Sequence, residues 1–177
     1  MAEQALVAVN LSAPQDVLDV PGIKLGSAAT GLKASDDTVV AHLDPQARVA
    51  GVYTQSSFAA APVLLARDRQ EDCQAWVINS GNANAATGEP GKQDARIICA
   101  AVAELLRIDS QQVQPFSTGV IGERLDVPAL TRAVAEATEK LRSDGWLSAA
   151  SAIMTTDTVP KLVSRRIALS AGEVVVT

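Results

Sequence analysis

The stretch CQAWVIN (residues 73–79), followed by SGNANAATGEPG (80–91) and KQDARIICAAVAELLR (92–107), decides the fold of this chain. Its first part is an apolar run typical of a strand, and its middle part is rich in Asn and Gly, which tolerate positive φ and favour a loop. Its last part repeats apolar residues at helical spacing. The residues that fall near one helix face are Ala95, Ile98, Val102, Leu105 and Leu106. The stretch therefore predicts a strand, a tight loop and a helix in succession.

Val-rich segments before this stretch predict a hairpin. TVVAHL (38–43) and RVAGVYT (48–54) have the composition of strands, and Asp44-Pro45 supplies a turn between them. After the central helix, VQPFSTGVIG (113–122) predicts a short strand that ends in a Ser-Thr-Gly turn.

Two more helices and a second hairpin complete the prediction. One helix follows Asp126, a suitable N-cap, with Pro128 in its first turn. Its apolar stripe consists of Leu130, Val134, Ala137 and Leu141. A third helix is expected over residues 144–153. The tail predicts a hairpin of KLVSRRIAL (161–169) and EVVVT (173–177), and because the chain stops inside an apolar strand, we expect that strand to pair with a segment absent from this chain.

Strands and helices mix here without a strict βαβ repeat, which predicts an α+β or mixed α/β fold with mixed sheets packed against helices. Without an internal repeat or a low-complexity linker, residues 1–177 are expected to form a single domain.

Composition narrows the classes of function. Apolar residues make up 47% and charged residues 20% of the chain, as in globular proteins, and the net charge of −5 argues against a nucleic-acid binder. The first ten residues do not resemble a signal peptide, and no apolar run is long enough to span a membrane, so a cytoplasmic protein is expected. Cys73, Cys99 and the single His42 form no metal-ligand spacing, which predicts no metal site and two cysteines that serve as core residues.

Three polar segments could carry chemistry, and each also has a purely structural explanation. The Asn-Gly loop (79–88) either joins a strand to a helix or lines a pocket. STGVIG (117–122) is either a turn or a pair of donors, one hydroxyl and one backbone N–H, aimed at an oxyanion. MTTDTVPK (154–161) is either a solvated turn or a substrate contact. With one His in the chain, no base is evident for a Ser or Cys nucleophile.

Five blocks taken together resemble the ornithine acetyltransferase family, the bifunctional glutamate N-acetyltransferases and amino-acid acetyltransferases. The blocks stand in the family's order and cover most of residues 22–161: GIKLGSAATGLK, VAGVYTQSSFAAAPV, NSGNANAATGEPG, PFSTGVIGERL and AIMTTDTVPK. The resemblance implies the ornithine acetyltransferase/DmpA-like N-terminal-nucleophile architecture. It also implies a precursor that cleaves itself before a Thr, which becomes the nucleophile of a β chain with its own α-amino group as base.

The reaction implied is a ping-pong transfer of an acetyl group from N-acetylornithine to glutamate in arginine biosynthesis. No cofactor is implied, although some members of the family use acetyl-CoA as the acetyl donor. The implied partner is a β chain in an assembly such as α2β2, with no nucleic acid and no membrane.

Carried onto this sequence, the family's oxyanion hole falls on Thr118 and Gly119, and its α-chain substrate contact falls on Thr155. The residues expected to support the site are Thr156, Asp157, Lys161, Asn79 and Asn82. The cleavage segment and nucleophile of the family have no match, because Thr177 follows Val-Val-Val.

This chain is therefore expected to be an α chain that is active only with its β chain. Two other hypotheses remain open at this point: an acyl transferase or aminopeptidase of the same architecture, and a non-catalytic binding module.

Overall fold

A four-stranded mixed sheet forms the centre of the computed structural model, which describes residues 16–69 and 72–177. Its strands, in spatial order, are β1 (Ile23–Ala28), β2 (Thr38–Leu43), β3 (Ala75–Asn82) and β4 (Val113–Val120). The first three strands are antiparallel neighbours, whereas β3 and β4 run parallel and are connected through α2 (Gly88–Leu106). The expected mixed sheet packed with helices is confirmed.

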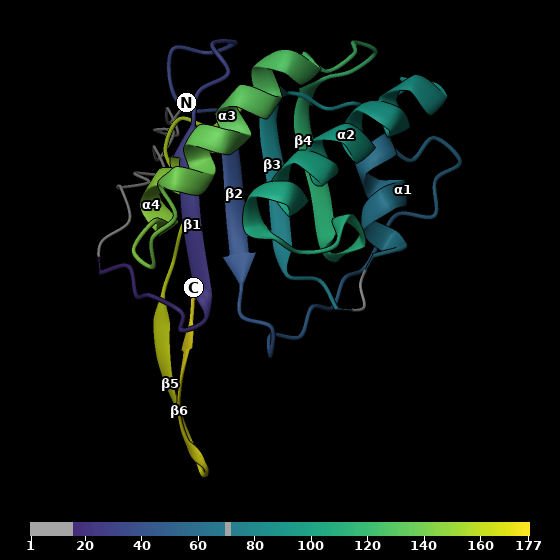
Figure 1. Ribbon diagram of the computed structural model, residues 1–177. Coiled ribbons are helices and arrows are strands. Elements are labelled where there is room, and N and C mark those ends of the chain that lie inside the picture. The colour runs from purple at the N-terminus through teal and green to yellow at the C-terminus, as the bar shows by residue number, and fades with distance from the viewer. Residues whose placement is uncertain (1–15, 70–71) are drawn as a thin grey trace, which may run out of the picture.

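Two helices cover one face of this sheet, as Figure 1 shows. They are α2 and α3 (Val127–Glu139), and they enclose the larger apolar core. Its buried residues come from alternate positions of the strands, such as Val40 and Val77, and from the predicted helix stripes, such as Ile98 and Val134. Asp126 caps α3 as predicted, because its Oδ1 accepts a hydrogen bond from Ala129 N at 2.9 Å.

The opposite face is covered only in part. The short helix α4 (Trp146–Ala152) packs against β1 and β2 and forms a smaller core that includes Leu25, Val39 and Ala152. The helix α1 (Ala61–Arg67) lies beside β4, and the 3-10 turn Ser110–Gln112 leads into that strand. The tail forms the predicted hairpin from β5 (Arg165–Leu169) and β6 (Gly172–Val176), which projects away from the sheet in Figure 1.

The hairpin predicted over residues 38–54 is wrong. A turn does follow β2, since Gln46 N donates to Asp44 Oδ1, but residues 48–54 form no strand and Val52 is fully exposed. The antiparallel partners of β2 are β1 and β3, which bury it from both edges. The Val content of 48–54 favours a strand locally, but β1 and β3 pair with β2 in its place.

The predicted loop 79–91 is shorter than expected. Strand β3 continues to Asn82 and α2 begins at Gly88, so only residues 83–87 connect them. The helix ends as predicted, at Arg107, whose φ of 57° is left-handed. The spacing predicted Leu105 on the buried stripe of α2, but Leu105 is exposed. Cys99, which was not assigned to that stripe, is buried. Helix α1 had no prediction.

Both cysteines are buried free thiols, as expected. Burial raises the pKa of Cys99 to about 11, which keeps its thiol protonated. In the described part of the chain, no helix is long and apolar enough to cross a membrane, and no group of three His, Cys, Asp or Glu side chains could hold a metal ion. The expectations for the first fifteen residues lie outside the described residues.

A glycine in β1 allows α3 to approach the sheet. A Cβ added at Gly26 would lie 2.0 Å from the Ala137 carbonyl oxygen, so Gly26→Ala must push the helix away and should lower the free energy of unfolding by about 1–3 kcal/mol. Denaturant titration measures this loss. Lys24→Ala, an exposed change in the same strand, is the control, and an equal loss in both variants would contradict the packing argument.

Candidate functional site

The parallel register of β3 and β4 brings two of the predicted segments side by side. Ser80 is the register partner of Thr118, and Gly81 is the partner of Gly119, so the Asn-Gly run and the Ser-Thr-Gly turn meet at the carboxyl ends of the two strands. The register shifts at Gly81 and Asn82, where a bulge ends the regular pairing. Such an interruption at a strand end re-aims backbone groups away from the ladder.

Gly119 is held where no other residue fits. Its φ is +132°, and an added Cβ would lie 2.2 Å from the carbonyl carbon of Gly81 and 2.5 Å from the Asn82 nitrogen. Both the backbone conformation and the close approach of β3 therefore require glycine. The predicted oxyanion residue thus stands at the tightest contact between the two strands.

The hydroxyl of Thr118 is available to a ligand. Residues paired across adjacent strands point to the same face, so Thr118 lies on the face of Ser80, whose Oγ donates to the Ala152 carbonyl in α4 at 2.5 Å. In the described part of the chain the Thr118 hydroxyl has no hydrogen-bond partner, unlike the hydroxyls of Ser80 and Ser117, which are engaged within the protein.

The buried amides of the Asn-Gly run brace the strand ends. Asn79 accepts from Ser117 Oγ at 2.6 Å and donates to the Asn82 carbonyl at 2.8 Å. Asn82 donates to the Arg124 carbonyl at 3.1 Å and accepts from Asn84 N at 2.7 Å. Asn79 thus ties the end of β3 to β4, and Asn82 fixes the turn after β3 against the turn after β4.

Further bonds hold the two turns. The Ala83 N–H donates to the Val120 carbonyl at 2.8 Å, and Gly122 N–H donates to Ala85 at 2.9 Å. Arg124 forms two hydrogen bonds with the buried carboxylate of Asp94 in α2, at 2.5 and 2.6 Å. This Arg–Asp pair has the parallel two-bond geometry that fixes orientation as well as distance. No sequence motif singles out this pair.

The third segment, TTD, follows the end of α4. The side chains of Thr155 and Thr156 are exposed and make no hydrogen bond within the described residues. Asp157 and Lys161 form an ion pair with each other, and Lys161 holds the pKa of the Asp157 carboxyl below its ordinary value. This pair closes the segment into a compact turn, while the two Thr hydroxyls stay accessible.

Lys33, which was not among the predicted site residues, connects these segments. Its ammonium group donates to Ser80 Oγ at 2.6 Å and to the Met154 carbonyl at 2.8 Å, and so joins the end of β3 to the residue before Thr155. The residue lies in the block GIKLGSAATGLK, but one Lys beside a Gly carries no signal that it reaches across the fold.

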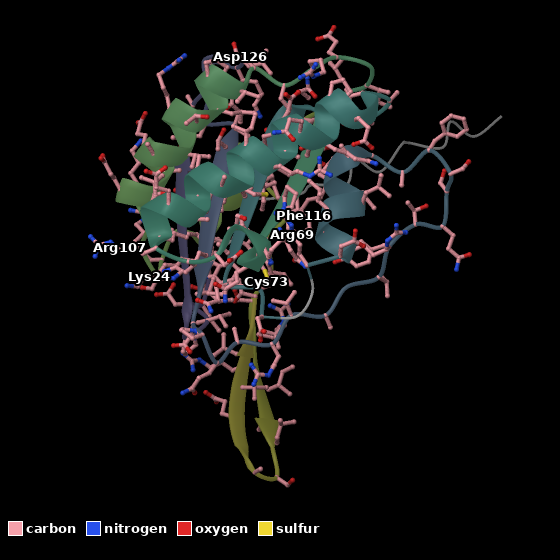
Figure 2. The ribbon with its side chains drawn as sticks, turned by 45° about the vertical axis from the view of Figure 1, so that its right-hand side comes forward. Lys24, Arg69, Cys73, Arg107, Phe116 and Asp126 are labelled. Atoms are coloured by element: carbon pink, nitrogen blue, oxygen red, sulfur yellow. The ribbon has the colours of Figure 1, made fainter. Side chains whose placement is uncertain are left out.

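A cavity of about 490 Å³ lies at the same end of the sheet. Its lining includes Asn79, Asn82, Leu32 and Arg132 of α3, but not Thr118, Gly119 or Thr155. The lining also includes Ser80 and Asn82, the two register partners of Thr118, so the cavity adjoins the strand ends without including the Thr118 side chain. Figure 2 marks this end by Asp126, far from Cys73, which precedes β3.

The described residues offer no base next to Thr118. The single His42 pairs with Ala75, at the opposite end of β3, and burial together with Lys24 lowers its pKa. A hydroxyl and a glycine N–H at one strand end can stabilise a negative oxygen, but an attacking group must come from elsewhere.

Comparisons with known proteins agree on one family. The model of the ArgJ family matches residues 24–177. The chain is 46% identical over 161 residues to the arginine biosynthesis bifunctional protein ArgJ of Methylococcus capsulatus, covering 89% of this chain and 40% of that protein. It is 42% identical over 174 residues to ArgJ of Pseudomonas syringae pv. tomato, covering 97% of this chain and 43% of that protein. The chain thus spans less than half the length of these relatives.

Two solved structures resemble the fold. The arginine biosynthesis bifunctional protein ArgJ of Bacillus halodurans superposes with a TM-score of 0.76 at 30% identity, covering 89% of this chain and 84% of that chain. The ornithine acetyltransferase of Mycobacterium tuberculosis complexed with ornithine gives a TM-score of 0.77 at 30% identity, covering 88% and 86%.

Replacing Gly119 should loosen the two strand ends. Gly119→Ala adds a Cβ that collides with the β3 backbone, so the bond from Ala83 N to Val120 O should open and the amides of 82–85 should exchange faster with deuterium. Gly172→Ala is a matched control, since Gly172 has a φ of +143° but open space around it. Unchanged exchange at 82–85 in Gly119→Ala would disprove the close contact.

Proposed function

We propose, because this chain belongs to the ArgJ family, that it supplies the oxyanion hole and part of the substrate site of an ornithine acetyltransferase. The observation that carries this proposal is the unengaged Thr118 hydroxyl beside Gly119, at a strand end where the other hydroxyls are consumed by structural bonds. The nucleophile is then provided by a β chain, which corresponds to the part of the ArgJ relatives that this chain does not span.

The proposed reaction has two acyl-transfer steps. The β-chain Thr attacks the acetyl carbonyl of N-acetylornithine, and its α-amino group takes the hydroxyl proton. Thr118 and the Gly119 N–H stabilise the oxyanion until the C–N bond breaks and the ornithine amine leaves with that proton. The glutamate amine then attacks the acetyl-Thr ester, and the Thr hydroxyl is restored. Acetyl-CoA is an alternative donor for the first step, and no cofactor is required.

Thr155 is the proposed substrate contact on this chain. Its exposed hydroxyl can donate to or accept from an amino acid, and Thr156 offers the same groups. The ion pair between Asp157 and Lys161 stabilises the turn that follows these two threonines. Asn79 supports β4 through Ser117, and Asn82 supports the turns that follow β3 and β4.

The uncovered part of the sheet fits a β chain beside Thr118. Helix α4 covers β1 and β2, whereas Phe116, on the same face of β4 as Thr118, is 37% exposed and packs edge-on against Trp76. Figure 2 shows the position of Phe116 on this strand. The exposed Phe116 ring near the Thr118 hydroxyl gives the β chain an apolar surface to pack against when it brings its N-terminal Thr to this face.

The β5–β6 hairpin offers a second contact with the β chain. The register places Ile167 opposite Val174. The apolar face of the hairpin carries Ile167, Leu169, Val174 and Val176, which are 41–55% exposed, and Arg165 lies at its end, opposite Val176. The other face carries the ion pair of Arg166 and Glu173. An apolar face on a projecting two-stranded sheet is typical of a surface that another chain covers.

We propose that the assembled α2β2 enzyme resides in the reducing cytoplasm, where the buried free thiols persist.

The experiment that tests the function is coexpression of this chain with the downstream β segment of its gene, followed by an assay of acetyl transfer from N-acetylornithine to glutamate. We expect one acetylglutamate for each ornithine released, and Thr118→Ala should lower the rate by about 10²–10³-fold through loss of one oxyanion donor. Thr138→Ala, which removes a hydroxyl bonded only to its own helix, is the control and should keep full activity.

Two outcomes would contradict this proposal. Release of free acetate without acetylglutamate would favour an aminopeptidase-like hydrolase of the same architecture. Full activity of Thr118→Ala in the assembled complex would remove the oxyanion assignment.

The hairpin contact is tested by charge placement. Ile167→Lys puts an ammonium group on the apolar face and should weaken copurification of the β chain, because the charge must be desolvated at the contact. Ala168→Lys puts the same group on the opposite face, opposite Glu173, and should leave assembly intact. Equal copurification of both variants would show that the apolar face is not covered by the β chain.

A further inference from the structure

We infer that Lys33 is a positioning residue that holds Thr155, the proposed substrate contact, at a fixed distance from β3, the strand paired with Thr118 and Gly119 of β4. This inference rests on the proposed function. It concerns an ammonium group that no step of the proposed reaction uses and that lies where three segments of the chain meet.

The Lys33 ammonium group uses its full donor capacity within the protein. Its Nζ donates to Ser80 Oγ at 2.6 Å, to the Met154 carbonyl at 2.8 Å and to the Ala152 carbonyl at 3.2 Å. An ammonium group has three protons, and each here has an acceptor from a different residue. In the described part of the chain no carboxylate forms an ion pair with Lys33, so oxygen dipoles alone compensate its charge.

The acceptors belong to the elements that carry the proposed site. Ser80 is the register partner of Thr118, and the Met154 carbonyl forms the peptide bond that leads into Thr155. Ala152 is the last residue of α4, where helix carbonyls lack intrahelical donors and a cation is favoured. Ser80 Oγ also donates to the Ala152 carbonyl at 2.5 Å, which closes the network. One ammonium group thus links β3, the strand paired with Thr118 of β4, to the TTD segment.

The loop that presents Lys33 is itself held firmly. The buried carboxylate of Asp37 accepts from Thr30 N at 2.8 Å and from Thr30 Oγ1 at 2.5 Å. Leu32 N donates in turn to Thr30 Oγ1 at 3.1 Å. Because Asp37 directly precedes β2, the position of Lys33 is fixed to the sheet and not only to a surface loop.

The consequence is a geometric role. Without the ammonium group, the Met154 carbonyl loses the donor that holds it against β3, whereas the Ala152 carbonyl keeps the bond from Ser80 Oγ. Residues 153–155 are then free to move away from β3, and Thr155 from Thr118. Misplacement of a reacting group by about 1 Å can cost about 10²-fold in rate. Loss of Lys33 should therefore act through Thr155 and not through the chemistry of the oxyanion.

Kinetics of the assembled α and β chains test this role. Lys33→Met keeps most of the side-chain length and removes the charge, and it should lower kcat/KM for N-acetylornithine by about 10²-fold. Ser80→Ala, a milder change in the same network, should lower it in the same direction. Lys24→Met, which neutralises an exposed lysine of β1, is the matched control and should not change kcat/KM.

A double-mutant cycle with Thr155→Ala separates positioning from general damage. If Lys33 acts through Thr155, then Lys33→Met should reduce kcat/KM by no more than about threefold in the Thr155→Ala background, since the group it positions is already absent. Independent, multiplying effects of the two changes would overturn the inference, as would wild-type kinetics of Lys33→Met.

Deuterium exchange tests the same link without any turnover. In the assembled protein, Lys33→Met should speed the exchange of amides in residues 153–157, whereas Lys24→Met should not. Unchanged exchange in Lys33→Met would overturn the positioning role even if the enzyme is active. If exchange changes as expected but the wild-type complex transfers no acetyl group, the network is real and the proposed function is wrong.

Discussion

The contact between the backbones of β3 and β4 at Gly81 and Gly119 is the constraint on which the candidate site depends. The two strands approach so closely there that a single added carbon at Gly119 has no room, and the register breaks immediately beyond it. Every residue of the site is placed relative to this contact. Thr118 directly precedes it, the braced turns follow it, and the segment before Thr155 is tied to Ser80, one residue ahead of it.

Polar groups around this contact divide into two sets. Asn79, Asn82, Ser80 and Ser117 are satisfied by partners within the protein, and the buried polar atoms among them therefore carry no cost of an unmade bond. Thr118 and Thr155 form no side-chain hydrogen bond with the residues that the structure describes, and leaving these hydroxyls unpaired costs little free energy because both side chains reach solvent. This division separates the scaffold from the groups that can meet a ligand, although the two sets are adjacent in sequence and chemically alike.

The sequence predicted the elements whose signals are local. The spacing of apolar residues in 92–107 and the cap at Asp126 predicted α2 and α3, because helix formation depends on residues within a few turns of one another. Strand pairing is a long-range choice, which is why 48–54 was assigned a strand that does not form and why β1, with its glycine at position 26, was missed. Thr118, Gly119 and Thr155 were reached only through a resemblance spread over five blocks. Lys33 and the pair of Arg124 and Asp94 could not be predicted, since their partners lie 30 or more residues away in the sequence.

The projecting β5–β6 hairpin has a consequence for how such a protein is made. Among the strands in residues 16–69 and 72–177, β5 and β6 pair only with each other, so an apolar face and two unpaired edges are presented together. Another extended strand, including one from an identical molecule, can pair with such an exposed edge. A chain that is joined to its intended partner during synthesis meets that partner at an effective concentration near the millimolar range. Under the proposed function, synthesis as one precursor with later cleavage would let the correct contact form before nascent copies collide with one another.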